Sequence, residues 1–411
     1  MATRKLVSKH VNVASGDYIG RDGELWVDTV TNLLKISDGA TPGGVVITTD
    51  GDITSTWANI TDINNGSGPS KIAVGFTAGY TTQGTSGIAI GNSAGSNTQG
   101  NFAVAIGATA GQTTQGTLAV AVGQAAGQTT QGANSIAVGY RAGYTGQSSN
   151  AVAIGSAAGT TAQGSEAVAV GVGAGDATQG ANAVAIGNAA GKTTQGGSAV
   201  AIGQLAGNNT QGISATAIGK SAGKTTQGTN AVAVGVEAGE TTQGTGAVAI
   251  GKQAGETTQG TQAVAVGIYA GYTGQGANAT AVGDSAGKTT QGASAVAVGN
   301  QAGETTQGTQ AVAVGIAAGY TTQGVGAVAV GGSAGYTTQG EYGIAIGSGA
   351  GETNQAANSI VLNATGEALN NIVEDVFIVK PVRGVAGAGL PAGFKQVAYN
   401  PTTGEFIYYD A

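Results

Sequence analysis

Most of the chain follows one short pattern of apolar, small and polar residues that returns every 16 residues. A glycine at Gly75 recurs without insertion or deletion as far as Gly347, which gives 18 copies between Lys71 and Ala356. The consensus is A-V-A-[VI]-G-x-x-A-G-x-T-T-Q-G-x-x. A fixed period of this length predicts a repeat architecture in which every copy forms one structural unit.

Each copy predicts two short β-strands. The A-V-A-V run alternates large and small apolar residues with period two, which indicates a strand with two different faces. The T-T-Q run suits a second strand because Thr fits a pleated surface, and the two glycines mark tight corners. Two strands and two corners make one rung of a β-solenoid. We therefore expect an all-β fold, a parallel β-roll of 18 rungs that would be roughly 85 Å long at ~4.8 Å per rung.

The two faces of the A-V-A-V strand predict different surroundings. One face carries Val or Ile in nearly every copy, and we expect it to form the core of the roll. The other face carries small residues, mostly Ala, which allow a second backbone to approach closely. A solvent-facing strand has no reason to be Ala in every rung, so we expect this face to pack against sister chains around a cyclic axis.

The invariant Gln of each copy is expected to lie directly above the Gln of the next. Stacked side-chain amides can hydrogen-bond along the axis of the stack, and the Thr pairs would stack in the same way. We assign a structural ladder to Gln83, Gln99, Gln115, Gln131, Gln227, Gln243, Gln259, Gln291, Gln307, Gln323 and Gln339.

The A-V-A-I-G-x-x-A motif resembles the head repeats of trimeric autotransporter adhesins. Members of that family form left-handed parallel β-rolls that assemble as trimers, so the resemblance implies a left-handed homotrimer. That family also carries a signal peptide, a coiled-coil stalk and a membrane anchor. The segment Met1–Ser8 has no apolar core of a secretion signal, so we expect synthesis in the cytoplasm of a host cell.

The N-terminal flank predicts strand, turn, strand and a Gly/Pro-rich exit, from G-E-L-W-V-D-T at Gly23–Thr29 and L-L-K-I-S-D-G-A-T-P-G-G at Leu33–Gly44. These motifs resemble a small N-terminal module of tailed-phage tail fibres, which lies at the virion-proximal end. Residues 51–70 are polar and rich in Gly and Asn, and we interpret them as a linker.

The C-terminal flank begins with a larger apolar rung, Ala357–Asn363, as expected for a cap. Strands are predicted at Val376–Arg383 and within Gln396–Tyr408. The motifs F-x-V-K-P-V-R and Y-N-P-T-T-G-E resemble the segment of viral fibres that precedes a self-cleaving intramolecular chaperone. The predicted organisation is an attachment module at 1–50, a linker at 51–70, a β-roll shaft at 71–363 and a C-terminal β domain at 364–411.

Composition excludes several classes of protein. The chain has 77 Gly, no Cys and a single His, so thiol chemistry, disulfide scaffolds and poly-His metal sites are excluded. The net charge of −7 argues against nucleic-acid binding, and no apolar run is long enough for membrane insertion. Charge is concentrated in the flanks, since only 16 of the 37 charged residues lie in the repeats.

Candidate chemistry in the repeats is weak. Gly191-Lys192-Thr193 and two similar copies lack the glycine spacing of a phosphate-binding loop. Glu237, Glu240 and Glu256 could supply a glycosidase pair, and Asp50 with Asp52 is the nearest approach to a metal site. We interpret both groups as solvated turns, and expect no catalytic, cofactor-binding or metal-binding residues.

Two surface features carry alternatives. Tyr272, Tyr320 and Tyr336 share one outward position with Tyr80 and Tyr144, and could contact a sugar or a receptor, or pack laterally within the assembly. The Thr array suggests ice binding, but neighbouring strand residues face opposite ways, so only one Thr of each pair is expected to join a lattice.

Together these observations predict a non-enzymatic, homotrimeric virion fibre, made without a signal peptide and exposed as an outer appendage. We expect a phage tail fibre that mediates host-cell attachment through a surface receptor or glycan and joins other virion proteins through its N-terminal module. The alternatives are a decorative or structural filament without a receptor, a cell-surface adhesin and, less favoured, an ice-binding solenoid.

Overall fold

The structure, a computed structural model, describes residues 25–28, 33–36, 40, 45–47, 60–61, 70–381, 396–400 and 405–409. It divides into two units, Met1–Asn150 and Ala151–Ala411. Most of the predicted N-terminal module and linker, and residues 382–395, lie outside the described residues. The three boundaries between the four predicted segments therefore stay predictions.

The first unit contains a small antiparallel sheet, β1 (Leu25–Asp28), β2 (Leu33–Ile36) and β3 (Val45–Ile47), in that order. Strands β1 and β2 coincide with the two strands that the flanking motifs predict, whereas β3 was not predicted. The short strand β4 (Ile60–Thr61) lies in the predicted linker and pairs antiparallel with β5 (Ile72–Val74). It covers the edge of the first rung.

Each rung of the first unit supplies one three-residue strand and one two-residue strand. The longer strands are β5, β7 (Ile88–Ile90), β9 (Val104–Ile106), β11 (Val120–Val122) and β13 (Ile136–Val138). The shorter strands are β6 (Thr82–Gln83), β8 (Thr98–Gln99), β10 (Thr114–Gln115), β12 (Thr130–Gln131) and β14 (Gly146–Gln147). Equivalent residues pair in parallel, so that Ala105 lies beside Ala121 and Gln115 beside Gln131.

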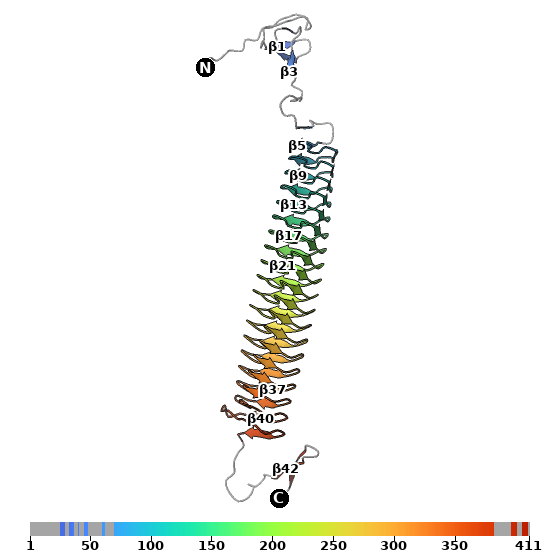
Figure 1. The fold of residues 1–411 in the computed structure, drawn as a ribbon. Coiled ribbons are helices and arrows are strands. Elements are labelled where there is room, and N and C mark those ends of the chain that lie inside the picture. The colour runs from blue at the N-terminus through green and yellow to red at the C-terminus, as the bar shows by residue number, and fades with distance from the viewer. Residues whose placement is uncertain are drawn as a thin grey trace, which may run out of the picture. The chain divides into compact units, whose positions relative to one another are not determined.

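The second unit repeats this arrangement over more rungs (Figure 1). Its longer strands are β15 (Val152–Ile154), β17 (Val168–Val170), β19 (Val184–Ile186), β21 (Val200–Ile202), β23 (Thr216–Ile218), β25 (Val232–Val234), β27 (Val248–Ile250), β29 (Val264–Val266), β31 (Thr280–Val282), β33 (Val296–Val298), β35 (Val312–Val314), β37 (Val328–Val330) and β39 (Ile344–Ile346). Its shorter strands are β16 (Ala162–Gln163), β18 (Thr178–Gln179), β20 (Thr194–Gln195), β22 (Thr210–Gln211), β24 (Thr226–Gln227), β26 (Thr242–Gln243), β28 (Thr258–Gln259), β30 (Gly274–Gln275), β32 (Thr290–Gln291), β34 (Thr306–Gln307), β36 (Thr322–Gln323) and β38 (Thr338–Gln339).

After the last full copy, β40 (Ile360–Asn363) and β41 (Phe377–Lys380) continue the sheet of longer strands in parallel. Strands β42 (Gln396–Asn400) and β43 (Glu405–Tyr409) form an antiparallel pair. The predicted fold class is confirmed: the repeats form a parallel β-solenoid with 16 residues per rung. The described residues contain no helix that could cross a membrane.

The interior of the rungs is lined by Ala and Gln, which corrects the predicted orientation of the strands. In the rung 247–262, Ala247, Ala249 and Ala254 have no exposed surface, and Gln259 is 1% exposed. Ile250 points outward and is 41% exposed. The expectation of a Val/Ile core and an outward Ala face is therefore wrong, and so is the proposed packing of sister chains on the Ala face.

The width of the rung explains this reversal. A Cβ added at Gly271 would lie 3.3 Å from the Cβ of Ala265 across the interior, and one at Gly255 would lie 2.9 Å from the Cδ of Gln259. The two walls are thus separated by a single thin layer of side chains. Only Ala and an extended Gln fit this layer, and branched Val or Ile side chains would overpack it.

The glycines stand where the backbone of one rung touches the next. Gly107 has a φ of 126°, and a Cβ there would lie 2.6 Å from the carbonyl oxygen of Gly123. Gly255 has a φ of 55°, in the left-handed region. Both predicted corners are therefore confirmed as positions where a side chain is excluded by sterics or by backbone conformation.

Left-handed residues other than glycine also occur twice in most rungs, which the consensus did not reveal. Glu237 and Gln253 (φ 59° and 57°) occupy one of these positions, and Asn230 and Gln262 (φ 58° and 57°) the other. Such a conformation costs about 1–2 kcal/mol for an L-residue, so the close parallel stacking of the strands sustains strain at the turns.

Two glycines of one rung provide a test of these steric roles. Gly171 (φ 131°) would place a Cβ 2.6 Å from the carbonyl oxygen of Gly187, whereas a Cβ at Gly173 (φ 63°) meets nothing within 4 Å. We expect Gly171→Ala to lower the free energy of unfolding by at least about 3 kcal/mol, because backbone must move. Gly173→Ala should lower the free energy of unfolding by only about 1 kcal/mol, because the new side chain meets no neighbouring atom and only the left-handed φ is unfavourable for it. Urea unfolding followed by circular dichroism measures both, and equal costs would contradict the steric account.

Candidate interaction surfaces

A ladder of glutamine side chains fills the interior of each unit, and in the second unit it starts at Gln179, whose Oε1 has no partner. In the second unit, Nε2 of Gln243 donates to Oε1 of Gln259 at 3.1 Å, and Nε2 of Gln259 donates to Oε1 of Gln275 at 3.0 Å. Nε2 of Gln259 also lies 2.7 Å from the carbonyl oxygen of Val248 and 3.3 Å from that of Ala263. Each amide therefore joins both walls of its rung to the next rung.

The structure brings the predicted ladder residues together, with one exception at the start. Bonds between successive amides run from Gln99 to Gln147 in the first unit and from Gln179 to Gln355 in the second. Gln83 lies half-buried and donates to two carbonyl oxygens, those of Ile72 and Gly87, while Oε1 of Gln99 has no partner. The ladder is thus a structural element, inaccessible to a ligand.

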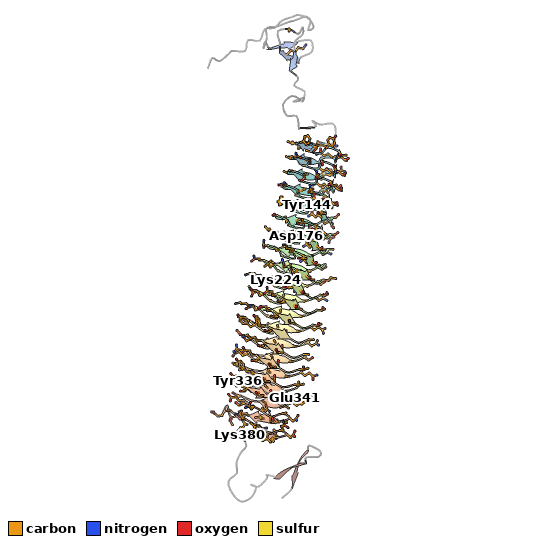
Figure 2. The ribbon with its side chains drawn as sticks, viewed as in Figure 1. Tyr144, Asp176, Lys224, Tyr336, Glu341 and Lys380 are labelled. Atoms are coloured by element: carbon orange, nitrogen blue, oxygen red, sulfur yellow. The ribbon has the colours of Figure 1, made fainter. Side chains whose placement is uncertain are left out.

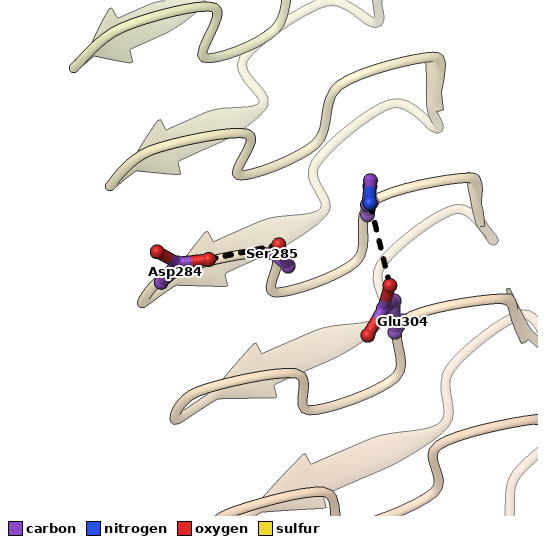
Figure 3. A network of polar contacts seen from close by, with 4 residues as sticks. Asp284, Ser285 and Glu304 are labelled. Carbon is purple, nitrogen blue, oxygen red and sulfur yellow. Dashed lines mark hydrogen bonds and ion pairs between the residues drawn. The ribbon is translucent and has the colours of Figure 1, made fainter.

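The residue after the second glycine of each copy forms an outward edge of mixed charge. Nζ of Lys224 lies 2.8 Å from Oε1 of Glu240, and Nζ of Lys288 lies 3.4 Å from Oε1 of Glu304. Figure 3 shows the second pair beside the hydrogen bond from Ser285 to Asp284, 2.8 Å long. The sequence carries a signal for these pairs, since the opposite charges stand one repeat apart, but the consensus does not reveal it because the position varies from copy to copy.

These ion pairs also weaken the enzymatic alternatives. Lys224 and Lys288 belong to two of the copies that look like phosphate-binding loops, yet both are paired to a carboxylate of the next rung. Glu240, a candidate for a glycosidase pair, is held by Lys224. Among the described residues, no group of three His, Asp or Glu side chains could hold a metal ion. Asp50 and Asp52 lie outside the described residues.

Four of the five tyrosines at this position contact a second ring or a cation, and the guanidinium of Arg141 lies 4.4 Å from the centroid of the Tyr144 ring. Tyr320 and Tyr336 stack with ring centroids 4.9 Å apart and planes 6° from parallel. Tyr272 meets Tyr269 edge to face at 5.6 Å. In Figure 2, Tyr336 lies on the same edge as Lys224, and Glu341 lies on the other. Stacked rings shield each other's faces, so their proposed contact with a sugar or receptor stays a prediction.

The threonine pairs differ from the prediction. The first Thr lies in the bend before the short strand and the second lies within it, so that both side chains point outward: Thr241 and Thr242 are exposed, as are Thr289 and Thr290. The expectation that the two side chains face opposite ways is wrong, because strand alternation does not extend into the bend.

A broad apolar band runs along the longer strands of each unit. Its members are the residues three before and one before the reference glycine of each copy, such as Val248 and Ile250. Across 18 copies these 36 positions hold 34 Val or Ile residues and two Thr, Thr216 and Thr280. Many are more than a third exposed, including Ile154 at 40% and Ile186 at 39%. We call this surface the Val/Ile band.

The surroundings of Glu256, a carboxyl group in the repeats, raise its pKa. Burial raises its pKa, and the nearby carboxylates of Glu240 and Glu237 raise it further, against a hydrogen bond from Gln253 that lowers it. Oε2 of Glu256 is buried without a partner. The Glu256 carboxylate in turn raises the pKa of Tyr272.

The raised pKa of Glu256 gives a pH-dependent stability. The folded chain holds this proton more tightly than the unfolded chain, so the ionised group opposes folding above its folded pKa, and this penalty disappears as the pH falls through that value. We expect Glu256→Gln to raise the urea midpoint at pH 7 and to have no effect near pH 4. Glu341→Gln, at an exposed turn, controls for the loss of one charge. A larger gain at pH 4 than at pH 7 would refute the assignment.

Comparison with known proteins does not assign the chain to a family. No protein-family model matches the chain, and neither a curated protein nor a solved structure shows significant similarity to it. The resemblances to adhesin heads and phage fibres therefore rest on the short motifs alone. What the structure establishes is the solenoid itself and the surfaces that it presents.

Proposed function

We propose that the chain is a structural, non-enzymatic subunit of a homotrimeric virion fibre. The observation that carries the proposal is the Val/Ile band, an apolar surface on the outside of the rungs that only Thr216 and Thr280 interrupt. Contiguous exposed apolar patches of this extent are typical of surfaces that bury themselves against another protein. The repeats favour a second copy as that partner, because only a matching array offers the same apolar pair in every rung.

Because the strands present Val and Ile outward, the proposed interface between subunits lies on the opposite strand face from the one that the sequence predicts. The Ala side chains are buried inside the rung. In this proposal the Val/Ile band, and not the Ala face, forms the interface between subunits. A cyclic arrangement uses one such band from each subunit and leaves no open end. The number three comes from the resemblance to trimeric adhesin heads.

The role at the virion follows from the flanks. The G-E-L-W-V-D-T and Y-N-P-T-T-G-E motifs resemble segments of phage fibres, and the β-solenoid repeats lie between them in the sequence. In this proposal the N-terminal module joins other virion proteins, and the distal surface attaches to a host receptor or glycan through repeated weak contacts.

The assembly is tested with two matched variants. Ile250 in the Val/Ile band and Val236 at a turn are both 41% exposed, and Lys220 and Lys252 occupy the position of Val236 in the adjacent rungs. We expect the native chain to have the mass of three 39.2 kDa copies in mass photometry. Ile250→Lys should shift the population to monomers, because the trimer would bury an unpaired charge. Val236→Lys should leave the trimer intact. A monomeric native chain contradicts the proposal.

The role on the particle is tested by antibody labelling and competition. Label on an outer appendage of intact virions, and blocked adsorption to one host strain by excess free protein, are the expected results. Label on the particle without any effect on adsorption would favour a decorative filament. Label on a cell envelope and none on particles would contradict the virion role.

A further inference from the structure

The threonine pairs form a second regular surface, separate from the Val/Ile band. We call it the threonine face and define it as the two T-T positions of each copy, such as Thr241 and Thr242. In the second unit, all ten threonines at the second position are exposed, and seven of the eleven at the first position are exposed. Equivalent residues pair in parallel register, Thr226 with Thr242 and Thr242 with Thr258.

The register fixes the spacing of the hydroxyl groups. Neighbouring strands lie about 4.8 Å apart, so each file of Thr repeats at that distance along the stack. Thr is branched at Cβ and has few χ1 rotamers, so the hydroxyl and methyl groups keep their positions without a large entropy loss. The face is therefore an ordered two-file array of groups that both donate and accept hydrogen bonds.

The hydroxyls of this array are unengaged. Among the described residues, no hydroxyl at either T-T position hydrogen-bonds to the protein, whereas Thr160, at the preceding position, donates to the carbonyl oxygen of Ala157 at 2.9 Å. The hydrogen-bonding capacity of the threonine face is directed wholly outward.

Charge is absent from the threonine face although it is common beside it. The 36 T-T positions hold only Thr, Asn, Ala and Gly, whereas eight of the 18 residues at the preceding position are Asp, Glu or Lys. β-propensity does not account for this, because the first Thr precedes the strand. An ordinary solvated surface would carry charges at both positions.

We infer that the threonine face binds ice. The distance of about 4.8 Å between successive Thr residues along the stack is close to the repeat of oxygen atoms along one axis of hexagonal ice. Rigid methyl and hydroxyl groups at this spacing can hold water in that lattice. Charged side chains, which hold their own hydration shells, would break it. A crystalline polysaccharide is the competing ligand, but it needs open aromatic faces for stacking, and the T-T positions hold no aromatic residue.

The test measures thermal hysteresis and inhibition of ice recrystallisation on the purified full chain. We expect both activities in the native protein. Thr242→Lys, in the middle of the face, should abolish most of the hysteresis. Asn208→Lys is the matched control, because Lys192 and Lys224 already occupy its position in the adjacent rungs, and it should retain the activity. Circular dichroism and urea unfolding show that both variants keep the fold.

Three results would overturn the inference. The first is a native chain without hysteresis or inhibition of recrystallisation. The second is an equal loss of activity in Asn208→Lys, which would show an effect of charge unrelated to the face. The third is retention on microcrystalline cellulose, lost in Thr242→Lys, by a chain that has no activity on ice. None of these outcomes bears on the trimer, so the inference and the proposed function fail independently.

Discussion

The narrow interior of the rung is the constraint from which the other features of this solenoid follow. Its walls are so close that it admits one layer of Ala methyl groups and one extended Gln per rung. Alanine alone would bury little apolar surface. The glutamine amide adds hydrogen bonds across the interior, since it donates to the carbonyl oxygens of Val248 and Ala263 and to the amide of Gln275 in the next rung. A buried polar chain that is satisfied at nearly every member specifies register as well as adding stability.

Because the interior is thin, the larger side chains point outward. The positions whose residue type differs between copies therefore lie on the outside of the solenoid. Three surfaces result, each with its own composition: the Val/Ile band, the edge of mixed charge and stacked tyrosines, and the threonine face. Because the rungs stack in register, residues at the same position of successive copies form a row along the surface. The left-handed turn residues, such as Glu237 and Gln262, are the strained points that close each rung.

The period and the strand positions could be predicted from the sequence because they depend on local alternation and on glycine spacing. The Gln ladder was equally accessible, since an invariant residue at a fixed period must stack on itself. The direction of the strand faces was not, because alternation shows that Ala249 and Ile250 face opposite ways without showing which way is inward. Hydrophobicity favours Ile inside, and only the distance between the walls, a property of the closed rung, reverses that choice. The exposure of both threonines escaped prediction for a related reason, because the bend at Thr241 breaks the alternation of the strand.

The stability of Gln243→Leu relative to that of Gln204→Leu tests most directly whether the amide ladder holds the rungs together. Gln243 is 1% exposed and bonds Val232, Ala247 and Gln259, whereas Gln204 is exposed at a turn. Leucine at position 243 leaves Oε1 of Gln259 buried without its donor, at about 1–3 kcal/mol. It also removes the bond to the carbonyl oxygen of Val232 and the bond from Nε2 of Gln227, at about 1 kcal/mol each, whereas the carbonyl oxygen of Ala247 keeps the N–H of Val232. The free energy of unfolding should therefore fall by about 3 kcal/mol. Gln204→Leu should be neutral. If Gln243→Leu were as stable as the native chain, an apolar interior would suffice and the amide ladder would not hold the rungs together.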